Sequence, residues 1–310
     1  MSLAHVRNGY VLGIDSDLLP QYRLNPFATR HVAAHAALAP ATAAIDSYFE
    51  QRLSGQQHCY TANGRQALNL ALQLLDLQPT DCVTIFTSSE NLYISGCVTR
   101  QIEQHCRWSR KMEPETKVIF VNHEFGLSYP NLPALKQHGL PIIEDCCYAF
   151  DSATAANQMG QVGDFVIYSF AKYFPVQFGG LLTAFARPLP ASPLDETSLQ
   201  YLKSVLSEYV ERLPEIRDRR LHNQQWLAQA LRRFALTPRF DFPAGEVPGV
   251  FMFAAPAELD LPELKNFLWN KGVHCSVFYG EQAFFIPVHQ ELSELDLGYF
   301  VACLDQFVNQ

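Results

Sequence analysis

The chain has 310 residues, of which 48% are hydrophobic and 17% are charged, and its formal net charge is -8 at pH 7. These values are typical of a globular protein with a large core, and they exclude a disordered or fibrous chain. The negative charge argues against general nucleic-acid binding, which needs a broad positive surface, so we predict no nucleic-acid partner.

The first 57 residues form an N-terminal segment in which the sequence predicts an alanine-rich helix from Thr29 to Leu53. His31 and His35 stand four residues apart in this helix and would share one face. A metal site needs further ligands, and the motif offers no nearby carboxylate or third ligand. We therefore predict no metal site here.

From residue 58 to residue 188 the pattern alternates between helices and short strands, which predicts a large domain. Asn63 and Gly64 are start signals for a helix in ANGRQALNLALQLLDL. A further helix, NLPALKQHG, makes a βαβ unit with its flanking strands, and repetition of such units predicts a doubly wound α/β sheet. Five β-branched or aromatic runs are typical of buried parallel strands: CVTIFTS, TKVIFVNHEFG, LPIIEDCC, DFVIYSF and GGLLTAFA.

Residues 189–310 change in character and are assigned to a smaller C-terminal α/β domain. A proline-rich connection, ARPLPASPLDE, leads to a long charged helix predicted from about Thr197 to Leu236. The tail then alternates again and ends in an amphipathic helix from Glu294 to Phe307.

A basic run, TRQIEQHCRWSRK, lies between two of the predicted strands of the large domain. Its cations are Arg100, Arg107, Arg110 and Lys111. We interpret the run as the solvated face of a helix, and contact with a nucleotide phosphate is the alternative.

Cysteine usage and the N-terminus bear on the compartment. The eight cysteines show no C-x-x-C spacing, and Cys146 and Cys147 are adjacent in an apolar run. This is typical of reduced, buried thiols and not of a disulfide framework or a zinc site. Because the N-terminus lacks the apolar part of a signal peptide and no stretch reaches membrane-spanning length, we expect a cytoplasmic protein with no membrane partner.

Polar residues follow the buried strands at the edge where ligands of doubly wound sheets bind. Glu144 and Asp145 end one strand, and buried carboxylates are costly unless a cation or donor meets them. Ser169 and Lys172 end another strand. The glycine turn of TANGRQAL comes directly before a helix, whose N-terminus can bind phosphate.

Lys172 has two chemical interpretations. With Tyr168 it spells Y-x-x-x-K, the pair of short-chain reductases, but that chemistry needs a helix across the pair and an early glycine-rich dinucleotide turn. Here a strand is predicted at Tyr168, and no such turn occurs near the N-terminus. A phosphate cradle, a strand-end carboxylate and a strand-end lysine, in this order, instead suit pyridoxal phosphate.

The sequence resembles the DegT/DnrJ/EryC1/StrS family of fold-type-I, pyridoxal-phosphate-dependent sugar aminotransferases. NGRQALNLAL is similar to the family's SGTAALxLAL, and LKQHGLPIIEDCCY to its LxxxHGLxVIEDAAQ. GDFVIYSFAKYFPVQFGG is similar to GDxxxFSFHPTKxxxxGEGG. The resemblance extends from about residue 58 to residue 307 and implies a three-layer α/β fold with a mainly parallel, doubly wound sheet.

The resemblance also implies roles for single residues. Lys172 would be the catalytic lysine that binds the cofactor's aldehyde as a Schiff base, and Asp145 the partner of its pyridine nitrogen. Tyr148 stands where the family has the glutamine or histidine that lies near the cofactor's phenolic oxygen. His123 is either a contact to cofactor or substrate or a hydrogen-bonded strand-end histidine.

The phosphate end of the cofactor would be held by Ser169 and by the backbone of Gly64 and Arg65. Three departures from the family pattern concern this end and the substrate. Arg65 replaces the usual threonine, two residues are missing between Ser169 and Lys172, and the segment after Gly180 is short and lacks the GYNxR motif. In the family, a partner subunit reaches the cofactor through that motif.

The activity implied by the resemblance is transfer of an amino group from an amino acid such as glutamate to a keto group of a nucleotide-linked sugar. The context would be polysaccharide or secondary-metabolite biosynthesis, and the assembly a homodimer. The alternative is a non-catalytic or regulatory relative that binds a sugar nucleotide. The missing segment favours that alternative, whereas the retention of both Asp145 and Lys172 opposes it.

Overall fold

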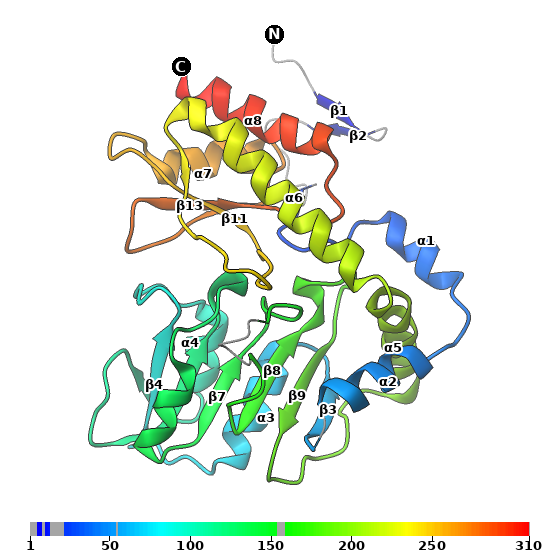
Figure 1. The fold of residues 1–310 in the computed structure, drawn as a ribbon, viewed down its shortest axis with the longest axis vertical. Coiled ribbons are helices and arrows are strands. Elements are labelled where there is room, and N and C mark those ends of the chain that lie inside the picture. The colour runs from blue at the N-terminus through cyan, green and yellow to red at the C-terminus, as the bar shows by residue number, and fades with distance from the viewer. Residues whose placement is uncertain (1–4, 8–9, 13–21, 54, 154–158, 310) are drawn as a thin grey trace. The chain divides into compact units, whose positions relative to one another are not determined.

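The computed structural model describes residues 5–7, 10–12, 22–53, 55–153 and 159–309 (Figure 1). The chain forms two compact units. The first, here called the sheet unit, contains residues 27–217 and 242–249, and the second, the C-terminal unit, contains residues 1–26, 218–241 and 250–310. The domain boundary expected near residue 188 therefore lies inside the sheet unit.

A seven-stranded sheet in the order β3-β9-β8-β7-β6-β4-β5 is the centre of the sheet unit. Strands β4 to β8 are parallel to their neighbours within that group, as the sequence predicts for β4, β6, β7 and β8. The strands are β3 (Gln57–Thr61), β4 (Cys82–Thr87), β5 (Arg107–Ser109), β6 (Thr116–Asn122), β7 (Ile142–Asp145), β8 (Phe165–Ser169) and β9 (Gly180–Ala184).

Strand β9 departs from the expectation of a parallel strand, because it runs antiparallel to both β8 and β3. Only residues 170–179 connect β8 to β9. A parallel neighbour would need a crossover of a dozen or more residues, so this short connection forces the chain to turn back. The glycine pair Gly179–Gly180 lies at this return, and Gly179 has a φ of 108°, which favours glycine.

Two hydrophobic cores cover the two faces of the sheet, which gives three layers. Helix α3 (Gly64–Leu74) packs on one face, where the buried side chains include Phe165 and Ile167 of β8. Helices α2 (Ala43–Arg52) and α5 (Glu196–Val210) pack on the other face against a cluster that includes Tyr168. Because side chains alternate along a strand, consecutive residues of β8 enter different cores.

Two predicted long helices are each divided. The helix expected from Thr29 to Leu53 is seen as α1 (Arg30–Ala36) and α2, separated by a stretch that contains Pro40. The helix expected from Thr197 to Leu236 is seen as α5, α6 (Leu213–Leu231) and the 3-10 turn η4 (Arg232–Phe234). Proline cannot donate a helical hydrogen bond, and Pro214 stands in the first turn of α6, where this costs nothing.

The basic run does not form one helix face. Helix α4 (Gly96–Ile102) contains only Arg100, and Arg107 lies in the edge strand β5. Arg107 pairs there with Glu113 and, at 3.1 Å, with Glu115. Its charge is therefore neutralised within the protein.

The C-terminal unit has its own antiparallel sheet in the order β10-β11-β13-β12. These strands and the helices around them bury a separate core that includes Phe251, Phe284 and Leu264. Its elements are β10 (Thr237–Pro238), β11 (Phe251–Ala254), α7 (Leu261–Asn270), β12 (Ser276–Val277), β13 (Ala283–Ile286) and α8 (Glu294–Val308). A two-stranded hairpin, β1 (His5–Arg7) and β2 (Tyr10–Leu12), precedes it in sequence.

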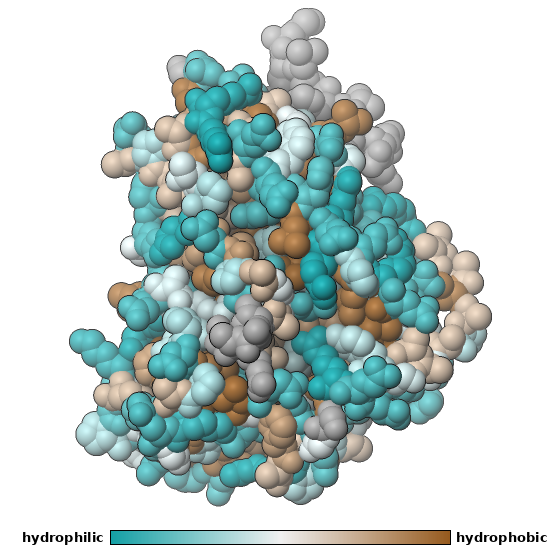
Figure 2. Space-filling view, viewed as in Figure 1, coloured by the Kyte–Doolittle hydropathy of each residue, from teal (hydrophilic) through white to brown (hydrophobic). Residues whose placement is uncertain are grey.

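The surface is mainly hydrophilic on the face drawn in Figure 2, with apolar patches between the polar side chains. One patch covers the region where Figure 1 places α5 and α2. Across the described ranges, no helix combines the length and the apolar character needed to cross a membrane.

Candidate active site

The carboxyl ends of three neighbouring parallel strands bring the predicted site residues to one edge of the sheet. β6, β7 and β8 are adjacent, and Asn122 pairs with Asp145 in the register. Because parallel strands end on the same side, the residues that follow β7 and β8 lie close together. Lys172 and Tyr148 are two such residues.

Lys172 lies in a 3-10 turn, η3 (Phe170–Lys172), that follows β8 without an intervening residue. The turn is fixed by backbone hydrogen bonds from Tyr173 and Phe174 to the carbonyl of Phe170, and by burial of these three rings. The Lys172 side chain, in contrast, is only half-buried. The aromatic anchors therefore hold the turn and leave the amine at the strand-end edge.

Among the described residues, Tyr148 is the hydrogen-bond partner of the Lys172 amine. Nζ donates a hydrogen bond to the Tyr148 hydroxyl oxygen at 3.2 Å and lies 4.8 Å from the centre of the ring. Tyr148 raises the pKa of Lys172 above its ordinary value, and this effect exceeds that of burial, which lowers it. Tyr148 therefore favours the charged form of the lysine.

The structure separates the two members of the Y-x-x-x-K match. Tyr168 is fully buried in the core shared with α2, and its ring lies 5.5 Å from the Arg52 guanidinium carbon. A Cβ on Gly160 would approach the Tyr168 hydroxyl to 2.2 Å, so that hydroxyl points at the loop backbone. The tyrosine that Lys172 contacts is Tyr148.

Asp145 is the last residue of β7 and is 7% exposed. Its Oδ1 accepts a hydrogen bond from the Cys147 amide at 3.0 Å. Burial raises the pKa of Asp145, although the Cys147 donors, His123 and Lys172 act against it. A further cation at this carboxyl would favour the ionised form.

Cys147 and Ser169 pack closely against Gly64 where helix α3 begins. A Cβ on Gly64 would lie 2.7 Å from Cys147 Sγ and 3.2 Å from Ser169 Cβ, so these residues meet at the helix N-terminus. Two side chains cap the start of this helix. The Asn63 side chain accepts a hydrogen bond from the Gln66 amide at 3.1 Å, and the Gln66 side chain accepts one from the Ala62 amide at 2.7 Å.

Two amides of the first helical turn lack an acceptor. Within the described part of the chain, the N–H groups of Gly64 and Arg65 have no hydrogen-bond acceptor. The Arg65 side chain itself is exposed and has no recorded partner there. The structure therefore brings Gly64 and Ser169 together, whereas it leaves the Arg65 guanidinium outside the contacts of the site.

Glu144 and His123 form a separate, closed network. The Glu144 carboxylate accepts hydrogen bonds from the Gly160 and Val162 amides at 2.8 Å each, from the Gly163 amide, and from His123 Nε2 at 3.1 Å. The other ring nitrogen of His123, Nδ1, accepts from the Tyr129 amide at 3.0 Å.

This network favours the ionised form of Glu144 and sets the tautomer of His123. Burial favours the protonated carboxyl, but His123 and the amides of Gly163 and Gly160 outweigh it and hold the pKa of Glu144 below its ordinary value. Since Nδ1 of His123 accepts, Nε2 carries the proton and donates to Glu144. Both ring nitrogens are thus engaged within the protein.

The same groups do not favour a metal. Cys146 Sγ lies within 4.8 Å of ligating atoms of His123 and Glu144. However, the carboxylate is saturated by backbone donors, and burial raises the pKa of Cys146 so that the thiol stays protonated. A metal ligand has to be deprotonated and free to donate, so these residues are poorly suited to the role.

His31 and His35 are likewise engaged in packing. His31 Nδ1 accepts from the Ala28 amide at 2.9 Å, and the two nitrogens of His35 face the hydroxyls of Tyr201 at 3.1 Å and Tyr209 at 3.5 Å. These contacts join α1 to α5.

Several residues at the site are not among the sequence predictions. Cys147 touches Gly64, and Phe125 packs on Tyr148 with ring centres 5.0 Å apart. Gly249 also contacts Tyr148, since a Cβ there would lie 2.6 Å from Tyr148 Cδ1. For Cys147 the sequence offers a signal, its position two residues after Asp145, whereas Gly249 gives none because it is about a hundred residues away along the chain.

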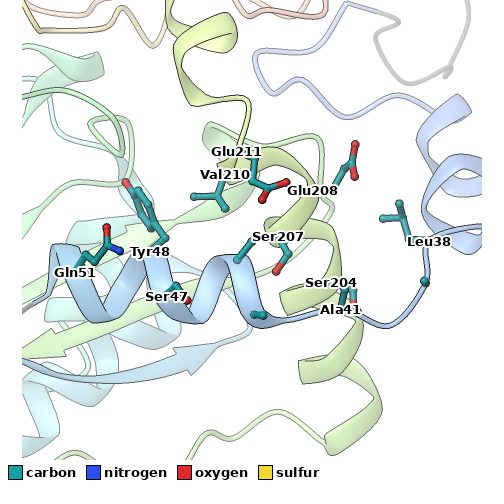
Figure 3. A pocket seen from close by; sticks show the side chains of 13 residues that line it. Leu38, Ala41, Ser47, Tyr48, Gln51, Ser204, Ser207, Glu208, Val210 and Glu211 are labelled. Atoms are coloured by element: carbon teal, nitrogen blue, oxygen red, sulfur yellow. The ribbon is translucent and has the colours of Figure 1, made fainter.

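A groove of about 770 Å³ lies on the outer side of α2 and α5 (Figure 3). Its described lining contains no lysine, arginine or histidine, and its titratable groups are Tyr48, Glu208 and Glu211. None of the predicted site residues lines it. The groove therefore offers no group that could bind an aldehyde or a phosphate covalently or by charge.

Comparison with solved structures identifies the fold as that of three-layer α/β aminotransferases. An aminotransferase, TlmJ, from Streptoalloteichus hindustanus matches 90% of this chain and 94% of its own, with a TM-score of 0.70 and 20% identity. The PLP-form of the putative sugar aminotransferase Spr1654 from Streptococcus pneumoniae matches 93% and 98%, with a TM-score of 0.72 and 14% identity.

Within that fold class, residues 37–184 match the model of the DegT/DnrJ/EryC1/StrS aminotransferase family. Over 135 residues the chain is 32% identical to UDP-N-acetyl-3-dehydro-alpha-D-glucosamine 3-aminotransferase of Acidithiobacillus ferrooxidans. That stretch spans 38% of this chain and 37% of the relative.

Proposed function

We propose that the protein is a pyridoxal-phosphate-dependent aminotransferase in which Lys172 binds the cofactor. One observation carries the proposal. A half-buried lysine, a buried carboxylate and an open helix N-terminus, contributed by Lys172, Asp145 and Gly64, meet at one edge of the sheet. The match of residues 37–184 to the DegT/DnrJ/EryC1/StrS aminotransferase family supports the same interpretation.

The residues present fit this cofactor at each of its polar groups. The N-terminus of α3 offers the unused Gly64 and Arg65 amides, to which the Ser169 hydroxyl adds a donor, and such a cradle suits a phosphate. The lack of a Cβ at Gly64 keeps the cradle open beside Cys147. Asp145, whose pKa burial raises, gains a cation if a protonated pyridine nitrogen lies against it.

The cofactor and the protein would contribute different parts of the chemistry. Pyridoxal phosphate, when bound, supplies an electron sink for the bond-breaking step. Lys172 contributes an amine that can hold the aldehyde and, once released from it, can carry a proton to and from the substrate carbon. Asp145 keeps the pyridine nitrogen protonated. The phenol of Tyr148 holds the amine in place between these events.

We further propose that an amino acid such as glutamate is the amino donor and a keto group on a nucleotide-linked sugar is the acceptor. The name of the Acidithiobacillus relative, which acts on a UDP-linked dehydro sugar, supports this substrate class. Polysaccharide or secondary-metabolite biosynthesis is the proposed context. The short segment after Gly180 concerns the acceptor site, since the chain has no counterpart of GYNxR there.

A homodimer in the cytoplasm is the proposed state of the protein. All eight cysteines lie in described parts of the chain, and none of them forms a disulfide, which agrees with a reducing compartment. Sedimentation of the purified protein tests the dimer, because a species at the mass of one chain, 35.0 kDa, at all concentrations contradicts it.

The absorption spectrum tests the cofactor. Purified protein titrated with pyridoxal phosphate is expected to gain a visible band that glutamate bleaches, and Lys172→Ala is expected to abolish the band. Tyr168→Phe is the matched control, because Tyr168 is buried away from Lys172, and it should leave the band intact. Protein that stays colourless with added cofactor would favour the non-catalytic, sugar-nucleotide-binding alternative.

A further inference from the structure

The segment Phe242–Gly249, here called the strap, belongs to the sheet unit although the chain on both sides of it belongs to the C-terminal unit. It is fastened at several points. The buried carboxylate of Glu246 accepts hydrogen bonds from the Ser128 hydroxyl and, at 3.2 Å, from the Ser128 amide. The Val247 amide donates to the Ser152 hydroxyl at 2.8 Å.

The last residues of the strap are fitted tightly against the turn that follows β6. The Gly249 amide donates to the Phe125 carbonyl at 2.7 Å. Phe125 has a φ of 51° and Gly126 a φ of 98°, and a Cβ on Gly126 would lie 2.0 Å from the Val247 carbonyl oxygen. Non-glycine residues rarely adopt such a conformation, so the strap and this turn fix each other.

Tyr148 is enclosed between these two segments. Its ring packs on Phe125, at 5.0 Å between ring centres, and its Cδ1 lies where a side chain on Gly249 would stand. The opposite end of the same ring carries the hydroxyl that accepts the hydrogen bond of Lys172. A displacement of the strap would therefore displace the phenol from the amine.

We infer that Tyr148 is the residue that positions the Lys172 amine, and that the strap, through Gly249, positions Tyr148. The inference deepens the proposed function, on which it rests for the chemical role of Lys172, but the contacts exist without the cofactor. Tyr148 stands where related aminotransferases are expected to carry glutamine or histidine, so this arrangement gives the chain its own means of holding the lysine.

Other titratable groups around the amine are Asp145, Cys147 and Cys97, and they are the competing explanations for its behaviour. Tyr148 is the foremost cause of the raised pKa of Lys172, ahead of both thiols. Burial raises the pKa of Cys147 well above its ordinary value, so this thiol is neutral at about pH 7. The phenol is the group whose removal should matter most.

The test uses the full-length protein without cofactor. The rate at which acetic anhydride acetylates Lys172 is measured by mass spectrometry over a pH range around about 10.4, the ordinary lysine pKa. The exposed Lys117 serves as the internal reference for reagent decay. Tyr148→Phe is expected to lower the midpoint for Lys172 by about one to two pH units, because burial remains while the acceptor is lost.

Gly249→Ala is the variant that isolates the strap. Gly249 does not have a positive φ, so alanine fits the backbone conformation. Its Cβ would come closest to the Tyr148 ring, at 2.6 Å, and would also press on the Phe125 carbonyl oxygen at 3.0 Å, so both walls of the phenol are tested together. We expect a smaller fall of the Lys172 midpoint in this variant. In the Tyr148→Phe background, Gly249→Ala should add no further shift, because its effect passes through the phenol.

The controls separate this inference from the proposed function. Tyr168→Phe and Cys97→Ser should leave the Lys172 midpoint within about 0.3 pH units of wild type, as expected for changes that do not touch the hydrogen bond. An unchanged midpoint in Tyr148→Phe, or equal shifts from Gly249→Ala with and without the phenol, would overturn the inference. Failure of pyridoxal phosphate to colour the wild-type protein would instead overturn the proposed function and leave the labelling result standing.

Discussion

Glu144 and Asp145 are consecutive in the sequence, both buried, and opposite in behaviour. On one side of β7, Glu144 is saturated by three amides and His123, and its pKa is lowered. On the other side, Asp145 is met mainly by Cys147, and its pKa is raised. The carboxylate of Glu144, whose hydrogen bonds are all made within the protein, stabilises the fold. The carboxylate of Asp145, which has fewer partners, can receive a ligand.

The largest expected effect is on the saturated side. Glu144→Gln should lower the free energy of unfolding by about 3 to 5 kcal/mol. The NH2 group of the glutamine side chain is a donor, and it would face backbone N–H groups that are donors themselves. Urea denaturation measures the loss. The control is Glu115→Gln, whose exposed pair with Arg107 should cost less than about 1 kcal/mol. Equal losses of unfolding free energy in Glu144→Gln and Glu115→Gln would contradict the stabilising role given to Glu144.

The phosphate cradle gives the next largest effect. Gly64→Ala should cost about 1 to 3 kcal/mol, because the new Cβ meets Cys147 Sγ at 2.7 Å, and it should also weaken binding of pyridoxal phosphate. Calorimetric titration and denaturation measure the two. Gly298→Ala in α8 is the matched control, since the site is open there and the helix should gain about 0.5 to 1 kcal/mol.

Asp145→Asn should separate stability from function. The unfolding free energy of the cofactor-free protein should stay unchanged or rise by about 1 kcal/mol, because a buried charge is replaced by a neutral group. The visible band formed with pyridoxal phosphate should be lost or greatly weakened, since the pyridine nitrogen loses its partner. A strong loss of stability together with a normal band would reverse the roles given to the two sides of β7.

The smallest effects concern pH. Because the pKa of Glu144 is lowered on folding, its stabilisation is present above about pH 4.3, the ordinary glutamate pKa, and is lost as the pH falls through the folded value. Because the pKa of Asp145 is raised, its cost is absent below about pH 3.9 and appears as the pH rises toward the folded value. The free energies of unfolding of Glu144→Gln and Asp145→Asn can be measured by urea denaturation across this pH window. Their differences from wild type should have opposite signs, and both differences should shrink at acidic pH.

Much of the site follows from the sequence because strand ends are local features. The positions of Asp145, Ser169 and Lys172 after apolar runs are enough to bring them together once the sheet is parallel. The role of Tyr148 as the partner of Lys172 needed coordinates, since strand periodicity says nothing of how a loop residue points. Its neighbour Gly249 is distant in sequence and follows no recognisable motif.

The fold could be predicted in outline for similar reasons. Alternation of strands and helices indicates the class, but the direction of β9 depends on the length of its connection rather than on its own residues. The edge strand β5 is three residues long and gives no periodic signal, so Arg107 could be mistaken for part of a helix. Breaks at Pro40 and Pro214 were visible in the sequence and explain the division of the two long helices.

The strap also determines the order in which the site can be completed during synthesis. The lysine, the carboxylate and the phosphate cradle all leave the ribosome before Phe242 does. Until the strap follows, Ser128, Ser152 and the Phe125 carbonyl lack the partners they have in the finished protein. A chain that stops before residue 242 would carry every residue expected to hold the cofactor, yet its Tyr148 would pack on Phe125 alone and lack the contact with Gly249.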